Sequence, residues 1–220
     1  MAILLNIDCA VETASVCLSD NAGVIKLAIS ENQKDHAAWL HASIRDLIRD
    51  AGLAVTDLSS IAVSIGPGSY TGLRIGLAAA KGLCYALKIP LICINTLKMM
   101  AQAEKSANSE LICPLIDARR MEVFTAIYNN SLEEIVKPFA MIVTKDSFDD
   151  FLSSHKIIFC GNGSKKLQTV LSHTNAIFSN ETATAANLSY LAHKYFQEKK
   201  FADLAYIEPL YLKEFYSAAH

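Results

Sequence analysis

A glycine-rich turn lies between two apolar runs and reads Gly66-Pro67-Gly68-Ser69-Tyr70-Thr71-Gly72-Leu73-Arg74-Ile75-Gly76-Leu77. Residues 61–65 before it are typical of a buried strand, and residues 71–87 predict a long apolar helix. Glycine permits backbone conformations and close approaches that other residues reach only with strain. We therefore predict a turn of fixed shape, in which Ser69 or Thr71 can cap the helix. A glycine-rich turn between a strand and a helix is also a common anion site, so phosphate is the first ligand to consider.

The elements predicted from the sequence come in the same order twice. The first copy has expected strands at 3–7, 14–18, 24–29, 61–65 and 91–94, and expected helices at 36–51, 71–87 and 96–103. The second copy has expected strands at 111–116, 123–128, within 135–143, at 157–160 and around Ile177. Its helices are expected at 147–152, after a second glycine turn at Gly161-Asn162-Gly163-Ser164, and at 185–196. Two β-β-β-α-β-α-β-α units predict an α/β protein of two lobes that face each other across a cleft.

We expect the lobes to be residues 1–104 and 105–220, with the C-terminal segment packing back on the first lobe. The second lobe is expected to be degenerate, because its predicted helices are shorter and it contains fewer glycines.

Composition narrows the class of protein. The chain has 220 residues, of which 52% are hydrophobic, and this is enough to bury a sizeable core. Its formal net charge of -2 does not favour tight RNA binding by the chain alone. Neither a secretory signal nor a membrane-spanning run is predicted. Six cysteines without zinc-type spacing are expected to be reduced core residues of a cytosolic protein.

Known nucleotide motifs fit the glycine turn poorly. Its spacing is GxGxxxG rather than GxGxxG, the next strand does not end at an acid, and no Walker string occurs. The duplicated plan instead indicates the architecture of sugar kinases, heat-shock ATPases and actin, which hold phosphates on hairpins beginning Asp-x-Gly-Thr. Here the hairpins begin Asp8-Cys9-Ala10 and Asp117-Ala118-Arg119, with side chains where bare backbone is needed. The sequence therefore indicates this fold but predicts that its hairpins no longer bind phosphate.

Catalytic and metal sites are not predicted either. His36 and His41 are five residues apart, so on a helix their side chains diverge by about 140°. Ser69 lies between glycines but not at the serine position of GxSxG. We expect no catalytic residue, no cofactor and no metal.

The predicted helix 71–87 is apolar nearly all round and contains small residues at Gly72, Gly76, Ala79 and Ala80. Small residues let another helix approach closely. The pattern fits packing against the protein's own sheet as well as packing against a partner helix, and it does not decide between them.

Residues 66–76 resemble the signature GPGS(F/Y)TGLRIG of the TsaB family, which is also called YeaZ. The resemblance extends over nearly the whole chain, to Ile7-Asp8, His36, Ile116-Asp117-Ala118-Arg119-Arg120, Gly161-Asn162-Gly163 and Pro209-Leu210-Tyr211-Leu212-Lys213. It departs at Cys9-Ala10, where the family usually has Thr-Ser, at Ala37, where serine is usual, and at Lys213, where arginine is usual.

The resemblance implies a two-lobed actin-like ATPase fold (the ASKHA, ribonuclease H-like class) without catalysis of its own. In that family, TsaB pairs with the catalytic subunit TsaD through its N-lobe helices and recruits the ATPase TsaE. The complex transfers a threonylcarbamoyl group from its adenylate to the adenosine beside the tRNA anticodon. A cytoplasmic protein that meets tRNA through the complex, and often forms a homodimer when alone, is implied.

Carried over to this chain, the partner helices are residues 36–51 and 71–87. The candidate interface residues are Trp39, Leu40, Ser43, Ile44, Leu47, Arg74, Ile75, Ala78 and Ala79. The candidate structural turn is Gly66, Pro67, Gly68, Ser69, Gly72 and Gly76. Two other functions stay open: an independent ASKHA-type small-molecule kinase or ATPase that uses the inter-lobe cleft, and a metallopeptidase.

Overall fold

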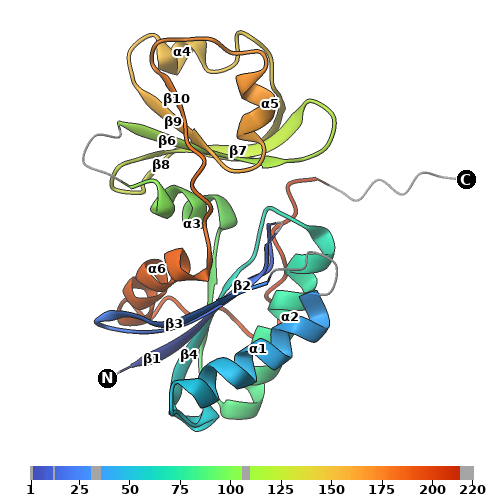
Figure 1. Cartoon of the computed structure of the whole chain (residues 1–220), viewed down its shortest axis with the longest axis vertical. Helices are drawn as coiled ribbons and strands as arrows, with labels where there is room; N and C mark the ends of the chain where they lie inside the picture. Colours follow the sequence, from blue (N-terminus) through green and yellow to red (C-terminus); the bar gives the residue numbers. More distant parts are fainter. Residues whose placement is uncertain (1, 12, 31–35, 106–109, 214–220) are drawn as a thin grey trace, which may run out of the picture.

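The computed structural model describes residues 2–11, 13–30, 36–105 and 110–213, which form two lobes built on five-stranded sheets (Figure 1). The first sheet has the order β3-β2-β1-β4-β5, from β1 Ile3–Asp8, β2 Ser15–Asp20, β3 Gly23–Ile29, β4 Leu58–Ser64 and β5 Leu91–Ile94. The second has the order β10-β9-β6-β7-β8, from β6 Leu111–Asp117, β7 Glu122–Asn129, β8 Glu134–Ile142, β9 Ile157–Cys160 and β10 Ala176–Phe178.

Each sheet begins with an antiparallel meander to which two later strands add in parallel. The helices between them are α1 His36–Asp50, α2 Tyr70–Leu87, α3 Thr96–Ala103, α4 Asp149–Leu152, α5 Ser164–Gln168 and α6 Ala185–Gln197, with a 3-10 turn η1 at Val55–Asp57. The duplicated unit predicted from the sequence is therefore confirmed.

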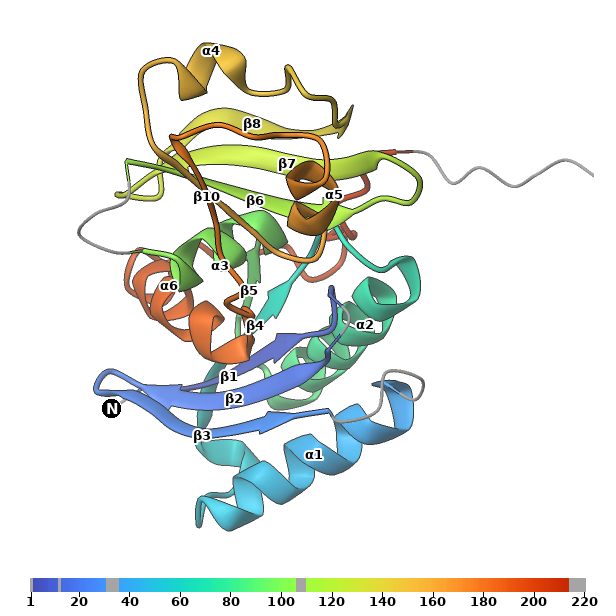
Figure 2. The ribbon, with the colours of Figure 1, turned by 45° about the horizontal axis from the view of Figure 1, so that its top comes forward.

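Helices cover both faces of the first sheet. Figure 2 shows α1 and α2 on one side of it and α6 on the other. Strand β1 is buried along its whole length, as expected for a central strand covered on both faces. Leu40, Ile44 and Leu47 recur at helical spacing on α1 and pack into the core between α1 and this sheet. Gly52, with φ 70°, follows the end of α1, where glycine adopts the left-handed conformation that commonly ends a helix.

The last helix of each unit packs on the opposite lobe or at its boundary. Helix α3 contacts β6 and β7 of the second sheet, whereas α6 lies across β1, β2, β4 and β5 of the first. Leu97 and Met99 of α3 and Leu188 of α6 share one core cluster with residues of both sheets. The lobes therefore have a continuous core between them, and the division into 1–104 and 105–220 stays a prediction.

Residues 202–213, which we call the C-terminal strap, run back over the first lobe and reach the second. Ala202 N donates to Leu91 O (2.8 Å), and Lys81 Nζ donates to Ile207 O (3.2 Å). At the far end, Lys213 Nζ lies 2.5 Å from Glu122 Oε1 of β7. The strap is thus fastened to both lobes.

Two local findings refine the sequence prediction. Ser69 is the N-cap of α2, since its Oγ accepts a hydrogen bond from Gly72 N (3.3 Å), as predicted. The helix expected at 147–152 begins only at Asp149, because Phe148 has φ 73°, a left-handed conformation that a helix does not continue through.

Candidate functional site

The glycine turn is shaped by the backbone it packs against. A Cβ on Gly68 would overlap the carbonyl oxygen of Ala10, and one on Gly72 would overlap that of Cys9. Both oxygens belong to the loop after β1. Gly66 has φ 120°, a conformation that other residues rarely adopt. Glycine is therefore required here so that the turn can lie directly on the first hairpin.

Three N–H groups of this turn donate within the protein. Gly66 N donates to Thr96 Oγ1 (3.0 Å), Ser69 N to Ala10 O (2.7 Å), and Gly72 N to Ser69 Oγ. Pro67 has no N–H to offer. An anion bound by these three groups would have to displace their internal hydrogen bonds, which supports a structural role for the turn.

Asp8 ends β1 and is fully buried. Its Oδ1 accepts hydrogen bonds from Ser64 Oγ and from Ala10 N (3.1 Å), whereas its Oδ2 has no hydrogen-bond partner among the described residues. Burial raises the pKa of this carboxyl to about 6, although both hydrogen bonds favour the ionised form. The aspartate of the first hairpin is thus shut inside the protein.

We expect Asp8→Asn to change how stability depends on pH. The folded-state pKa of Asp8, about 6, lies above the reference value of 3.8, so the ionised form is disfavoured by folding. The contribution of Asp8 to the free energy of unfolding therefore falls as pH rises from about 4 to about 6 and is constant above that range. Between pH 4 and pH 7, the free energy of unfolding of the natural protein should fall by up to about 3 kcal/mol more than that of Asp8→Asn. Urea denaturation at several pH values measures this difference, and parallel curves for the two proteins would contradict it.

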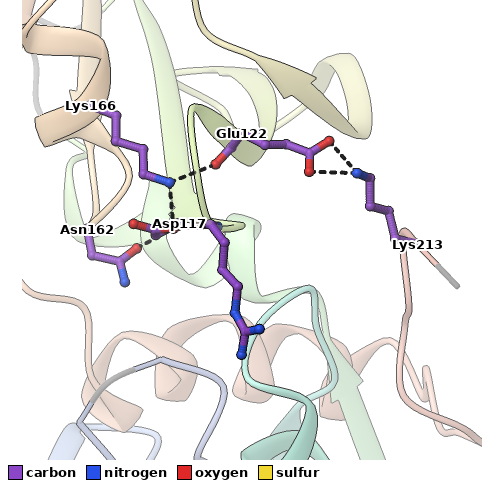
Figure 3. Close-up of polar contacts among 6 residues, drawn as sticks. Asp117, Glu122, Asn162, Lys166 and Lys213 are labelled. Atoms are coloured by element: carbon purple, nitrogen blue, oxygen red, sulfur yellow. Dashed lines mark hydrogen bonds and ion pairs between the residues drawn. The ribbon is translucent and has the colours of Figure 1, made fainter. Parts of the chain in front are cut away.

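Asp117 ends β6, the counterpart of β1, and is held by an ion pair (Figure 3). Lys166 Nζ lies 2.6 Å from Asp117 Oδ1 and also donates to Glu122 O (3.1 Å). Asn162 Oδ1 accepts from Asp117 N (2.9 Å), and Arg119 N donates to Asp117 Oδ1 (2.6 Å). Partial burial raises the pKa of Asp117, but the hydrogen bonds from Lys166 and Arg119 outweigh it and hold the pKa below its usual value. The carboxylate of the second hairpin is therefore already neutralised by the protein.

Lys166→Met is expected to raise the pKa of Asp117. The substitution removes the cation and its hydrogen bond but leaves the partial burial that disfavours the carboxylate. An NMR titration of the Asp117 carboxyl carbon should move from below 3.8 in the natural protein to that value or above. Lys165→Met, one residue away and exposed, is the matched control and should leave the titration unchanged. An equal shift in both variants would show that the ion pair does not hold the pKa.

An open pocket of about 320 Å³ lies between the lobes. Thr13 of the first hairpin, Asn162 of the second glycine turn and residues 179–183 before α6 line it. A Cβ on Gly161 would meet Leu115 O at 2.5 Å and overlap Met100 Cε, so this glycine lets α3 approach the turn. The described part of the chain contains no group of three or more His, Cys, Asp or Glu side chains placed to hold a metal ion.

The nine candidate interface residues differ in how far a partner could reach them. Leu40, Ile44, Leu47 and Ala79 are buried in the first lobe's own core, with at most 7% of each residue exposed. Trp39, Ser43 and Ile75 are partly exposed, and Arg74 and Ala78 are exposed. The interface stays a prediction, but burial corrects its membership: those first four side chains support the helices from beneath.

Gly72 and Gly76 also face inward, toward Cys9, and so do not offer a surface for another helix. The small residues that remain accessible lie further along α2. Ala78 is exposed, and a Cβ on Gly82 would meet nothing within 4 Å.

A stripe of exposed residues, Arg74, Ala78, Gly82 and Tyr85, runs along α2; we call it the α2 stripe. Tyr85 is 80% exposed and was missed by the sequence interpretation, although its spacing from Ala78 and Gly82 places it on the same helical face. Helix α1 packs beside α2 (Figure 2). Small residues flanked by a large aromatic side chain allow close packing of a partner helix with an anchor at one end.

Arg74 is held in place at one end of this stripe. Its guanidinium carbon lies 4.0 Å from the centre of the Tyr70 ring, and its Nε donates to Tyr211 Oη (3.0 Å). The two tyrosine rings are 5.2 Å apart. The strap therefore contributes Tyr211 to the surface around the α2 stripe.

The six cysteines are all free. Five are buried and Cys93 is partly buried, as predicted for core residues. Burial raises the pKa of Cys113 to about 12, so its thiol is not poised as a nucleophile. Among the helices that the structure describes, none is long and apolar enough to cross a bilayer.

Two lobes with the same strand order, a shared core and helices on the sheet faces define the two-lobed actin-like (ASKHA, ribonuclease H-like) class. The TsaD family model, described as tRNA N6-adenosine threonylcarbamoyltransferase, matches residues 27–218. The tRNA threonylcarbamoyladenosine biosynthesis protein TsaB of Bacillus subtilis is 30% identical over 219 residues, which cover 96% of this chain and 93% of that protein. Escherichia coli TsaB is 35% identical over 126 residues, covering 57% and 54%. The chain therefore belongs to the TsaB (YeaZ) family, as its glycine turn predicted.

Solved structures support the same fold. YeaZ from Pseudomonas aeruginosa superposes with a TM-score of 0.84 at 24% identity, over 96% of this chain and 100% of that chain. A protein of the same organism described as similar to peptidase YEAZ gives a TM-score of 0.86 at 24% identity, over 97% and 100%. At these identities the likeness concerns the fold alone.

Proposed function

We propose that this chain is a non-catalytic scaffold subunit of the complex that transfers a threonylcarbamoyl group to the adenosine next to the tRNA anticodon. Relatives that match over 93% and 83% of their own length are named as tRNA threonylcarbamoyladenosine biosynthesis proteins. In this proposal the chain acts in the cytoplasm, binds and activates a TsaD-type catalytic subunit and recruits a TsaE-type ATPase. It meets tRNA through the complex, and a homodimer forms through the same helices when the partner is absent.

The observation that carries the proposal is the α2 stripe. Ala78 and Gly82 are exposed in the isolated chain, yet alanine and glycine give a helix surface that another helix can approach closely. Tyr85 places a large, 80% exposed ring on the same face. Aromatic anchors of this kind commonly contribute most of the binding energy at protein interfaces. A helix of the catalytic subunit packed along this stripe would cover all three residues.

The hairpin geometry supports a scaffold rather than a phosphate-transferring role. Asp8 is shut in by burial, and Asp117 is paired with Lys166. Neither carboxylate stands free at the mouth of the cleft to position a phosphate or a metal ion.

Reconstitution of tRNA modification from purified subunits tests the proposal. We expect modified adenosine to form when this chain is present with TsaD-type and TsaE-type proteins and to fall to background when it is left out. Equal activity without the chain would overturn the scaffold role. Calorimetry of the isolated chain with Mg-ATP provides the second measurement, because micromolar binding with turnover would instead support the kinase or ATPase alternative.

A further inference from the structure

The helix that follows the meander is much shorter in the second lobe than in the first. In the first lobe this helix is α1, which has 15 residues and packs over β2 and β3. In the second lobe the corresponding helix is α4, which has only 4 residues. The second sheet is therefore covered much less at the position equivalent to that of α1.

An open hollow of about 220 Å³ lies at this position, between α4 and strands β7 and β8. Its floor is apolar, and it is formed by Ile127, Val136, Phe139, Met141, Phe148 and Phe151. Four of these side chains are only partly buried against the hydrophobic core on the outer side of the second sheet: Val136, Met141, Phe148 and Phe151. Next to Val136 on the edge strand, Ile135 is 49% exposed. We call this surface the second-lobe hollow.

The rim of the hollow is acidic. Asp146, Asp149 and Asp150 line it, and all three are exposed. The cation nearest in sequence, Lys145, lies 4.0 Å from Asp146, and their side chains are 80% and 70% exposed. Because this ion pair is long and exposed to solvent, Lys145 neutralises little of the negative charge of the rim. The hollow thus combines an apolar floor with a negatively charged rim.

We propose that the second-lobe hollow docks a basic amphipathic helix of a partner protein, in the place that α1 occupies in the first lobe. The apolar side of such a helix covers the floor, and its lysine or arginine side chains meet the three aspartates. Helix-in-groove binding of this kind relies on apolar residues at i, i+3, i+4 and i+7. The acidic rim repels nucleic acid and anionic membrane, which favours a protein as the occupant.

The strap of this chain is not placed to fill the hollow. The ion pair between Lys213 and Glu122 holds its end. Glu122 is next to Val123 on β7, and the side chain of Val123 belongs to the hydrophobic core on the outer side of the second sheet. Glu122 therefore points to the inter-lobe side of the sheet, whereas Ile127 at the hollow belongs to the outer side. Figure 1 places α4 at the end of the molecule opposite α1. A partner in the hollow and a partner on the α2 stripe can therefore bind at the same time.

The probe for the test is a fluorescein-labelled 18-residue helical peptide of leucine and lysine with one apolar face, and the control peptide has glutamate in place of lysine. Fluorescence anisotropy with the full chain should show binding of the lysine peptide only. Asp149→Asn combined with Asp150→Asn should weaken that binding about tenfold at low salt, because two rim charges are lost. The matched pair Asp46→Asn and Asp50→Asn removes the same charge from α1 and should leave the affinity unchanged. In NMR spectra, the methyl signals of Val136 and Met141 should shift when the peptide is added.

Three results would overturn the proposal. The first is equal loss of affinity in both aspartate pairs, which would indicate nonspecific charge attraction. The second is a set of peptide-induced methyl shifts outside the hollow, including those of Ala78 on α2. The third is a concentration-dependent shift of the Met141 signal without peptide, together with a dimer in light scattering, because a second copy would then be the occupant. Both aspartate pairs leave the α2 stripe intact, so failure here is distinct from failure of the scaffold role.

Discussion

Ala78→Glu is expected to reduce binding of the TsaD-type subunit at least about 100-fold while the chain remains folded. Ala78 is exposed on the α2 stripe, so a glutamate there points into water in the free protein. In the proposed complex the same carboxylate would be buried against a closely packed helix without a cation to pair with it. An unpaired buried charge costs several kcal/mol, and each 1.4 kcal/mol is about tenfold in affinity. Isothermal titration calorimetry with the catalytic subunit measures the loss.

Ala22→Glu is the matched control for this experiment. Ala22 is also exposed, but it lies in the turn between β2 and β3 rather than on α2. It receives the same side chain and the same charge, and binding should be unchanged. Thermal unfolding of both variants should match that of the natural protein. Full affinity in Ala78→Glu would show that the partner does not contact the α2 stripe.

The same substitution at the neighbouring residue, Ala79, would give a misleading test of the interface. Ala79 is only 7% exposed and packs in the core of the first lobe. A glutamate at Ala79 would place a charge in that core and destabilise the fold itself, so a loss of binding would say nothing about the interface. The sequence alone did not distinguish Ala78 from Ala79 as a test position.

The reason lies in what helical periodicity measures. The apolar stripe of Leu40, Ile44 and Leu47 predicts that the helix buries one face, and the structure shows that this face meets the protein's own sheet. A second, partner-facing stripe need not be strongly apolar. On α2 it consists of one arginine, two small residues and one tyrosine, a pattern too weak to recognise before the buried face is known.

Elements that rest on local signals were predicted closely. The strands 91–94 and 157–160 and the helix 96–103 have the expected bounds. By contrast, the packing of α6 on the first sheet joins residues far apart in the chain. Local propensity carries no information about such contacts, which depend on how the two units face each other.

The hairpin aspartates show the same division between local and tertiary information. The sequence showed that both hairpins lack the glycine of the phosphate-binding Asp-x-Gly-Thr motif. It did not show that Asp8 would be completely buried or that Lys166 would pair with Asp117, since α5 approaches β6 only through the tertiary fold.

Two glycines on one helix should respond in opposite directions to the same substitution. Gly72→Ala is expected to destabilise the protein by about 3 kcal/mol, because its Cβ would overlap the backbone oxygen of Cys9. Backbone lies on both sides of this contact, so no flexible side chain can move away. Gly82→Ala adds the same methyl group where nothing lies within 4 Å, and it should stabilise α2 by about 0.5–1 kcal/mol through higher helix propensity.

Urea denaturation of the two variants separates the roles of these glycines. Gly72→Ala should also lower the melting temperature by about 6–12 °C, as expected for a loss of this size in a chain of this length. Similar small gains in both variants would show that α2 can shift away from the first hairpin, and the joint between turn and hairpin would then not be rigid. Opposite signs would show that Gly72 is required by contact within the first lobe, while Gly82 is left free for contact outside it. The glycines of one apolar helix would then serve two ends: those near the turn fix its position, and the one near its far end keeps the α2 stripe open to a partner.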